Sequence, residues 1–250
     1  MFHAAAFKHV ALLEDQPARA VRNNVWATHL LADLAVENGV EYFVLISTDK
    51  AVDPSSVMGA SKRLAERLIE GHAITANGIH FISVRFGNVL GSSGSVVPIF
   101  QKQIEEGGPV TVRGKTVSRF FMSIPEAAGL VITSAALGVN GDQFILDMGQ
   151  PVRIADLAEQ MIRLSGKTPG KEIAIEFSEL LPGEKAHEAL NSADEDLAET
   201  PHPKIKRIQR ANVQDPEWDI LLSELEEARE QGDDYALRIL MKFVPGFRSK

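Results

Sequence analysis

The feature of this sequence that most constrains its fold is a short apolar run, YFVLIS, at residues 42–47. A strand with one face in solvent alternates apolar and polar residues, whereas a run that is apolar throughout is typical of a strand buried on both faces. Such strands occur in parallel sheets, whose connections are usually helices that cover the sheet. The run therefore predicts an α/β fold with a parallel sheet.

The segments around this run alternate between helical and strand patterns. Apolar residues recur with a helical period from about Ala18 to Asn38, and again within residues 54–72. A second apolar run, IHFISVRFG, follows at residues 79–87. The order helix, strand, helix, strand is typical of βαβ units. We therefore expect the C-terminal part of a doubly wound, Rossmann-like sheet.

The pattern changes after residue 90, so we expect three regions. Residues 1–90 are predicted to form a partial Rossmann-like core, 91–200 a mixed α/β region to which core elements return, and 201–250 a charged helical extension with a helix around Leu221–Met241. Between residues 91 and 200 the pattern predicts helices at 99–106, 124–137 and 153–166, and strands at 110–114, 142–149 and 171–180.

Composition excludes several classes of protein. The net charge of −8 argues against nucleic-acid binding. The chain has no cysteine, which excludes a thiolate metal site, and we expect no metal. No apolar run approaches the ~20 residues of a membrane helix, so we expect no membrane contact from this chain. The 44% hydrophobic content is enough for a folded core.

One expected element is missing from the sequence. A doubly wound nucleotide-binding domain begins with a strand, a glycine-rich turn and a helix whose N-terminus holds a pyrophosphate. No GxGxxG stretch occurs here, and GSSGS at residues 91–95 follows a late strand. The opening FHAAAFKHV has the pattern of a strand end and a loop. We therefore expect that the chain lacks the first βα units of its domain.

The residues with the clearest chemical potential follow the first buried strand. Thr48, Asp49 and Lys50 stand where the strand ends, and open α/β sheets bind their ligands at that edge. Met58 and Lys62 are four residues apart, so they share one face of the next helix. A solvated turn is the simpler interpretation of this segment, but a carboxylate beside two lysines favours catalysis.

Six blocks of sequence, in order, resemble one known family. They are HAAAFKHVALLE, NNVWAT, ISTDKAVDPSSVMGASKRLAE, VRFGNVLGSSGSVVPIFQKQI, VSRFFMSIPEAAGLV and LPGEKAHEAL. Together they resemble the nucleotide-sugar 4,6-dehydratases of the extended short-chain dehydrogenase/reductase superfamily. More narrowly, they resemble the UDP-N-acetylglucosamine 4,6-dehydratases of bacterial polysaccharide biosynthesis, the CapD-like group. The resemblance covers roughly residues 1–200.

The resemblance implies a reaction and assigns catalytic residues. NAD⁺ takes a hydride from C4 of the sugar and returns it to C6, which gives a UDP-4-keto-6-deoxy sugar. Thr48, Met58 and Lys62 occupy the positions of the superfamily's Ser/Thr, Tyr and Lys, and large members of this group carry Met in place of Tyr. A thioether cannot take a proton, so we expect Asp49 or a water to serve the C4 hydroxyl. Lys50 is the expected base at C5, and Asp49 the expected acid at the leaving C6 hydroxyl.

The resemblance also implies binding residues in both parts of the chain. The expected contacts of NAD are His3, Ala4, Ala5, Lys8, Asn24 and Lys62. The expected contacts of the UDP-sugar are Asn88, Ser95, Val96, Val97, Arg119, Glu184 and Lys185. A guanidinium suits a diphosphate because it is forked and always charged. Leu181 departs from the family, which often has Arg before PGEK, so one diphosphate or uridine contact is in doubt.

Several consequences of the resemblance concern the whole protein. It implies a cytoplasmic enzyme whose full-length relatives form homo-oligomers, some of them anchored to the inner membrane. We expect the 250-residue chain to be N-terminally truncated and inactive. Two alternatives stay open: an epimerase of the same superfamily, against which Met58 and the Asp49–Lys50 pair argue, and a non-catalytic remnant that binds a nucleotide sugar, which the missing turn supports.

Overall fold

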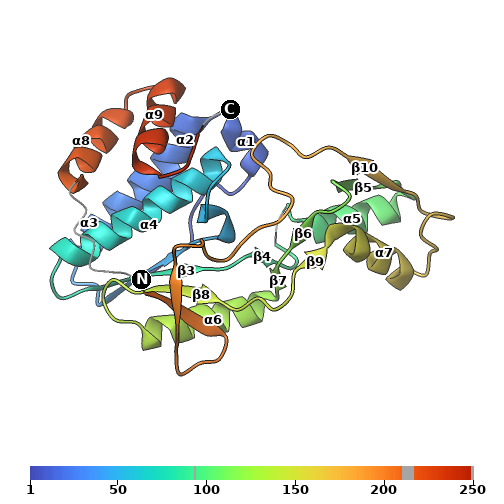
Figure 1. The fold of residues 1–250 in the computed structure, drawn as a ribbon, viewed down its shortest axis with the longest axis horizontal. Helices are drawn as coiled ribbons and strands as arrows, with labels where there is room; N and C mark the ends of the chain where they lie inside the picture. The colour runs from blue at the N-terminus through green and yellow to red at the C-terminus, as the bar shows by residue number, and fades with distance from the viewer. Residues whose placement is uncertain (93, 210–216, 249–250) are drawn as a thin grey trace.

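A six-stranded sheet forms the centre of the structure, a computed structural model that describes residues 1–92, 94–209 and 217–248 (Figure 1). Four neighbouring strands run parallel, and two antiparallel strands complete one edge. In spatial order the strands are β1 (Phe2–His3), β2 (Tyr42–Ile46), β3 (His80–Arg85), β8 (Gln143–Leu146), β12 (Ile205–Gln209) and β11 (Asp196–Glu199). Helical crossovers join the parallel strands, which confirms the predicted α/β fold class.

Helices cover both faces of the sheet, and Figure 1 shows α4 and α6 on opposite sides of β3 and β8. The covering helices are α3 (Ala27–Glu37) and α4 (Val57–Thr75) on one face and α6 (Ile124–Leu137) on the other. Phe43 and Leu45 pack towards α3 and α4, whereas Val44 packs towards α6. Successive side chains of a strand point to opposite faces. The run YFVLI is therefore apolar throughout because both of its faces are buried, as predicted.

A further layer of helices packs on the outer side of α4 and shares an apolar core with it. It consists of α1 (Val10–Glu14), α2 (Pro17–Ala20), α8 (Trp218–Ala228) and α9 (Asp233–Phe243). The helix predicted from Ala18 to Asn38 is present, but a π-helical segment, Val21–Trp26, joins α2 to α3. Within the described ranges, no helix is both long enough and apolar enough to cross a membrane.

The structure corrects the prediction for residues 201–250. The helix predicted around Leu221–Met241 is two helices, α8 and α9, because Gly232 adopts an extended conformation before α9. The region also supplies β12, in which Ile205 and Ile208 are buried. Two apolar residues spaced three apart do not match the alternation that indicates a strand, so the sequence pattern missed β12.

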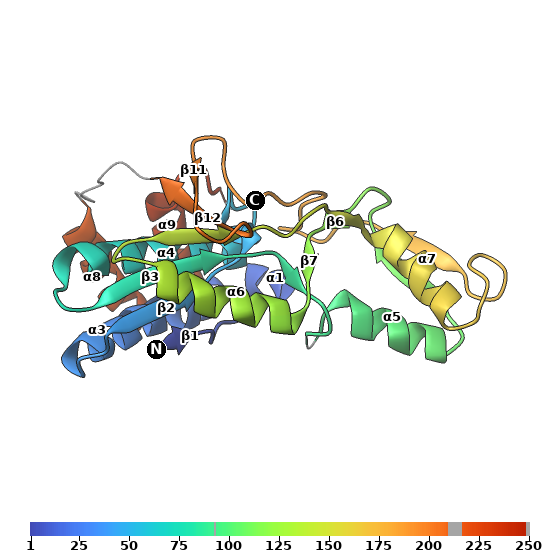
Figure 2. The same cartoon turned by 90° about the horizontal axis from the view of Figure 1, so that it is seen from below.

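A smaller lobe with its own core lies to one side of the sheet (Figure 2). Its elements are α5 (Val96–Glu105), β5 (Val110–Arg113), α7 (Ile154–Leu164) and β10 (Ile175–Ser178). β5 and β10 pair in parallel, and Phe100, Val112 and Ile162 are buried between these elements. The helix predicted from Ile99 begins three residues earlier, because Ser95 takes the extended conformation of an N-cap.

Two short strand pairs lie between the sheet and the smaller lobe, and the sequence pattern did not predict them. The pairs are β4 (Asn88–Val89) with β7 (Phe121–Met122), and β6 (Ser118–Arg119) with β9 (Val152–Arg153). They bring Asn88 and Arg119, two residues predicted to bind the substrate, to the junction of the two parts.

Candidate active site

The carboxyl ends of the parallel strands meet at one edge of the sheet, where open α/β sheets bind ligands. Residues 4–8 follow β1, a 3₁₀ turn at Asp49–Ala51 follows β2, and Gly87 and Asn88 follow β3. Thr48 caps the turn by accepting a hydrogen bond from the Lys50 amide at 3.4 Å. The topology of the fold thus gathers many of the predicted residues at one edge.

Lys50 is the centre of this group. Its ammonium donates to Oδ1 of Asp49 at 2.9 Å and to Oδ1 of Asn88 at 3.1 Å. The hydroxyl of Thr48 donates to the same Asp49 oxygen at 2.9 Å. The structure therefore brings together four of the predicted residues, three from the turn after β2 and one from the segment after β3.

Asp49 lies behind Lys50 and is fully buried, with 0% of its surface exposed. Its second oxygen, Oδ2, is buried and has no hydrogen-bond partner among the residues described. A Cβ at Gly87 would lie 3.0 Å from this oxygen, so the backbone after β3 closes over it. Asp49 therefore holds Lys50 but lines neither of the two cavities at this edge.

Two adjoining cavities lie between the sheet edge and the smaller lobe. The larger, of about 880 Å³, is lined by residues that include Lys8, His9, Arg113 and Thr111. The smaller, of about 210 Å³, is lined by residues that include Lys50, Ser95, Lys185 and Glu188. The cavities adjoin because both are lined by Asn88, Val96, Arg119 and Glu184. An ammonium thus reaches a small cavity that continues into a larger one.

The start of α5 forms one wall of the smaller cavity. Ser95 and Val96 line it, while Val97 is half-buried and lines neither cavity. The Ser95 hydroxyl is buried and has no hydrogen-bond partner within the described part of the chain. A hydroxyl in that state is available to a ligand in the cavity.

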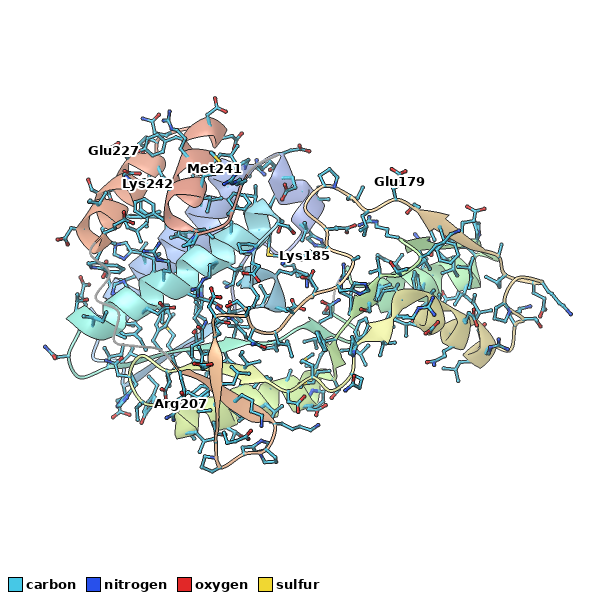
Figure 3. The ribbon with its side chains drawn as sticks, in the orientation of Figure 1. Glu179, Lys185, Arg207, Glu227, Met241 and Lys242 are labelled. Carbon is cyan, nitrogen blue, oxygen red and sulfur yellow. The ribbon has the colours of Figure 1, made fainter. Side chains whose placement is uncertain are left out.

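The segment from β10 to β11 crosses over the junction, and Figure 3 shows Lys185 on it. The guanidinium of Arg119 donates to the carbonyl oxygens of Lys185 at 2.8 Å and Ala186 at 3.1 Å. The Lys185 ammonium donates to the Val52 carbonyl at 2.8 Å. Arg113 forms an ion pair with Glu184 at 2.6 Å. The predicted substrate residues of this segment are therefore also its anchors.

Glu188, on the same segment, is a site residue that the sequence patterns did not reveal. It lines the smaller cavity with Lys50, and its Oε2 is buried without a hydrogen-bond partner in the described ranges. Burial raises the pKa of the Glu188 carboxyl; the charge of Lys50 lowers it and that of Asp49 raises it again. The block LPGEKAHEAL contains this residue, but the resemblance assigned roles only to Glu184 and Lys185 within that block.

Residues predicted to contact the cofactor surround the segment after β1. Asn24 holds this segment: it accepts a hydrogen bond from the Phe7 amide at 2.8 Å and donates to the Phe7 carbonyl at 3.0 Å. His3 is buried, and its Nε2 lies 2.9 Å from the Thr28 hydroxyl. Burial, helped by the charge of Lys62, lowers the pKa of His3 to about 4. Ala4, Ala5 and Lys8 are exposed, and Lys8 lines the larger cavity.

Lys62 lies inside the protein on α4, 5% exposed. Its ammonium donates to the Ile46 carbonyl at the end of β2, at 2.7 Å. Burial lowers the pKa of Lys62 to about 8, against the opposing effect of the Glu66 charge. The hydrogen bond uses one of the three protons of this ammonium, and Lys62 lines neither of the two cavities.

Met58 is buried in the apolar cluster that α1, α2 and α4 share with the C-terminal helices. It lines neither cavity. Met58 therefore packs among apolar side chains, and the structure does not bring it together with Lys50.

A buried ion-pair network fixes the ends of the strands that carry the site. Arg85 of β3 donates to both oxygens of Glu66 at 2.7 Å, and also to Glu195 at 2.8 Å. The Ser47 hydroxyl donates to Glu66 at 2.5 Å. These contacts join β2, β3, α4 and the segment before β11. The sequence did not predict this network, because an Arg in an apolar strand does not reveal its partners.

Comparison with known proteins identifies the family. The sequence profile of the polysaccharide biosynthesis protein family matches residues 1–210. Over 225 residues the chain is 49% identical to the capsular polysaccharide biosynthesis protein CapD of Staphylococcus aureus, covering 90% of this chain. Over 230 residues it is 50% identical to the probable polysaccharide biosynthesis protein EpsC of Bacillus subtilis, covering 92% of this chain. The chain spans 37% of the length of that CapD and 38% of that EpsC.

Solved structures share the fold. The structure of Pen from Bacillus thuringiensis matches with a TM-score of 0.77 at 37% identity, over 83% of this chain and 65% of that one. The dTDP-glucose 4,6-dehydratase DesIV of Streptomyces venezuelae, solved with NAD, matches with a TM-score of 0.67 at 20% identity, over 76% and 63% of the two chains. At that identity the likeness shows the fold alone.

Some related sequences are named for an epimerase reaction. A UDP-glucose 4-epimerase of Rickettsia canadensis is 36% identical over 200 residues, covering 79% of this chain and 57% of that protein. The family profile covers most of the chain, and two relatives are about half identical to it, which confirms the resemblance seen in the six sequence blocks. The chain belongs to the polysaccharide biosynthesis protein family and is also similar in sequence to a UDP-glucose 4-epimerase.

Proposed function

We propose that this chain carries the catalytic residues of an NAD-dependent 4,6-dehydratase that converts UDP-N-acetylglucosamine to a UDP-4-keto-6-deoxy sugar for polysaccharide biosynthesis. The observation that carries the proposal is the position of Lys50: its ammonium, held by Asp49 and Asn88, faces a cavity of about 210 Å³ that adjoins one of about 880 Å³. The smaller cavity would hold the sugar and the larger one the nucleoside diphosphate.

Several residues at the ends of β1 and β2 suit a bound NAD. Lys62 has two ammonium protons to donate beside the end of β2, and Asn24 holds the segment that contains Ala4, Ala5 and Lys8 at the end of β1. We assign these residues and His3 to the cofactor. When bound, NAD⁺ would accept a hydride from C4 of the sugar and later return it to C6.

We assign the removal of the C5 proton to Lys50. A ketone at C4 makes the C5 proton acidic, and a base must then lie within hydrogen-bond reach of it. Lys50 faces the cavity, and its two oxygen partners fix the direction of its side-chain nitrogen, which would take the C5 proton as the neutral amine. Asn88, Ser95, Val96 and Val97 are assigned to the sugar end of the substrate.

The nucleoside diphosphate is assigned to the larger cavity. Its lining includes the cations Lys8, Arg113 and Arg119, which suit a ligand of two phosphates. Glu184 neutralises part of that charge through its pair with Arg113. Lys185 and Arg119 would also keep the segment between β10 and β11 closed over the substrate. We place the reaction in the cytoplasm, in a homo-oligomer.

An epimerase is the second candidate, and the similarity to a UDP-glucose 4-epimerase favours it. An epimerase of this superfamily normally uses a Tyr where this chain has Met58. The buried position of Met58 offers no replacement for a phenol. A non-catalytic protein that binds UDP-sugars is the third candidate, since the two cavities could hold a nucleotide sugar without turning it over.

Proton NMR in D₂O separates the three candidates. The 250-residue chain, and a chimera in which it replaces the matching segment of the Staphylococcus aureus CapD, are incubated with NAD⁺ and UDP-N-acetylglucosamine. We expect a new C6 methyl signal with deuterium at C5, which Lys50→Ala abolishes. A C4 epimer without a methyl signal would indicate the epimerase. An unchanged sugar from both proteins, with binding still measurable by calorimetry, would indicate the non-catalytic protein.

A further inference from the structure

A cluster of potential metal ligands lies outside the candidate active site. His29 and Asp33 are on α3, His72 is on α4, and none of the three lines either cavity. One ring nitrogen of each histidine and one oxygen of Asp33 lie within 4.8 Å of one another. The sequence did not predict this cluster, because His29 and His72 are 43 residues apart and the fold is needed to bring them together.

The packing of two helices builds the cluster. Residues four apart in a helix share one face, so His29 and Asp33 project from the same side of α3. α3 packs beside α4 through small side chains that include Ala32 and Ala65 (Figure 1). The helices are therefore close enough for His72 to meet the pair on α3. Its Nδ1 lies 3.8 Å from the Asp33 carboxylate, and the Nε2 of His29 lies 3.4 Å from the same group.

The spacing of these groups suits one ion. Nδ1 of His29 is 3.0 Å from Nε2 of His72, so the two rings share a hydrogen bond. Such a bond needs a lone pair on one of the two nitrogens, so at least one ring is neutral, which is the form that binds metals. Two nitrogens that are each roughly 2.0–2.1 Å from a tetrahedral zinc lie about 3.3 Å apart. Small rotations of the three side chains would therefore bring one atom of each to a common zinc.

The surroundings of the cluster are closed on one side and open on the other. His72 is buried against the rings of Phe81 and Trp218, whereas the Asp33 side chain is 48% exposed. An ion can therefore enter from solvent at the carboxylate and keep water as a ligand on that side. The apolar rings behind His72 exclude water, which strengthens the attraction between the ion and the carboxylate.

We propose that His29, Asp33 and His72 form a zinc-binding site, with water completing the coordination. Imidazole nitrogen and carboxylate oxygen are both common ligands of zinc. The incoming ion would displace the proton that the two rings share, and this proton would pass to solvent. The ion would join α3 to α4 beside Trp218, the first residue of α8, and would stabilise the packing of these helices. The inference does not depend on the proposed function.

The two tryptophans of the chain report on this site. The ring centroids of Trp218 and His72 are 5.4 Å apart, as are those of Trp26 and His29. The experiment titrates Zn²⁺ into the 250-residue chain after removal of metal with a chelator, and follows binding by tryptophan fluorescence and calorimetry. We expect one zinc per chain, a change in fluorescence, and a melting temperature that rises with the zinc concentration.

Two single substitutions locate the bound ion. His29→Gln and Asp33→Asn each remove one ligand at a position that is not fully buried, so both variants should fold. We expect each to weaken zinc binding by at least about tenfold and to remove most of the rise in melting temperature. Glu37→Gln is the matched control, because Glu37 is exposed one turn beyond Asp33 on the same helix. This variant should bind zinc as the unchanged protein does.

Two results would overturn the site. One is the absence of any heat or fluorescence change at millimolar Zn²⁺ in the unchanged protein. The other is an equal zinc affinity in His29→Gln, Asp33→Asn and Glu37→Gln, because the ion would then bind elsewhere on the chain. Neither result bears on the dehydratase, since the three ligands lie outside both cavities. Turnover of the UDP-sugar by the chimera should be the same for His29→Gln as for the unchanged protein.

Discussion

Gly59 leaves no room for a side chain against the backbone of Lys50. A Cβ at this position would lie 2.2 Å from the Lys50 carbonyl oxygen, so the first turn of α4 packs directly on the turn that carries Asp49 and Lys50. Ser56 begins the helix at this contact by accepting a hydrogen bond from the Gly59 amide at 3.0 Å. The position of Lys50 therefore depends on a residue that has no side chain.

Gly59→Ala should displace the turn of Asp49 and Lys50. We expect loss of more than about 1 kcal/mol of unfolding free energy, because backbone atoms must move to admit the methyl group. Gly129→Ala is the matched control, since a Cβ added to this helical glycine on α6 would meet no atom within 4 Å. That change should stabilise the protein by about 0.5–1 kcal/mol, the ordinary gain of Gly to Ala in a helix. Urea denaturation measures both, and equal effects would contradict the contact.

The ion pair of Glu66 and Arg85 should dominate the stability of the sheet edge. Glu66→Gln leaves a buried guanidinium without its main partner, and we expect a loss of about 3–5 kcal/mol of unfolding free energy. Glu106→Gln removes an exposed partner of Lys102 on α5 and should leave the unfolding free energy nearly unchanged. Similar losses in the two variants would show that the buried network contributes no more than a surface pair.

Buried histidines should make the protein less stable in mild acid. Burial lowers the pKa of His72 to about 4, as it does that of His3. In the unfolded chain both titrate near pH 6.5, so between pH 6.5 and 4 the unfolded state binds more protons. Stability from these groups is therefore complete above pH 6.5 and is lost as the pH falls towards 4.

His72→Phe should reduce this loss. The imidazole of His72 packs against the rings of Phe81 and Trp218, so a phenyl ring suits the position. The melting temperature of the variant should fall less between about pH 7 and pH 4.5 than that of the unchanged protein. His9→Gln, at an exposed position, should keep the original dependence. An identical pH dependence in all three proteins would contradict the role of His72.

Arg119→Lys should weaken substrate binding more than it slows the reaction. The guanidinium donates to the carbonyl oxygens of Ser118, Lys185 and Ala186, and a Lys cannot match this planar set of donors. The segment that carries Lys185 and Glu188 would then close less firmly, and we expect KM for the UDP-sugar to rise about tenfold. Arg163→Lys, exposed on α7, is the control. An unchanged KM would mean that Arg119 does not hold this segment.

Sequence patterns predicted the parts of the fold that rest on local regularity. The alternation of helices with apolar runs predicted β2, β3 and α4, because a strand buried on both faces leaves a clear signal. The strand β12 left none, since its two buried isoleucines do not alternate. The break between α8 and α9 depends on Gly232, and a glycine alone did not distinguish a break from a tolerated helix position.

The residues of the candidate site likewise fall into those that the sequence predicted and those that it missed. Thr48, Asp49 and Lys50 were predicted because they follow the end of a parallel strand, whereas Asn88 was predicted from the family resemblance. Glu188 and the pair Glu66–Arg85 were missed, because their contacts join segments far apart in the chain and no local pattern records them. The sequence also identified Asp49 and Met58 as candidate site residues. It did not show that both side chains are buried outside the two cavities.

The most direct test of the proposed chemistry is the proton NMR time course in D₂O with NAD⁺ and UDP-N-acetylglucosamine, run on the 250-residue chain and on the chimera, each with and without Lys50→Ala. We predict a C6 methyl signal with deuterium at C5 from at least one of the two proteins, and no methyl signal after Lys50→Ala. A methyl signal that survives Lys50→Ala would contradict the role of Lys50. A spectrum without any methyl signal from either protein would contradict the dehydratase itself.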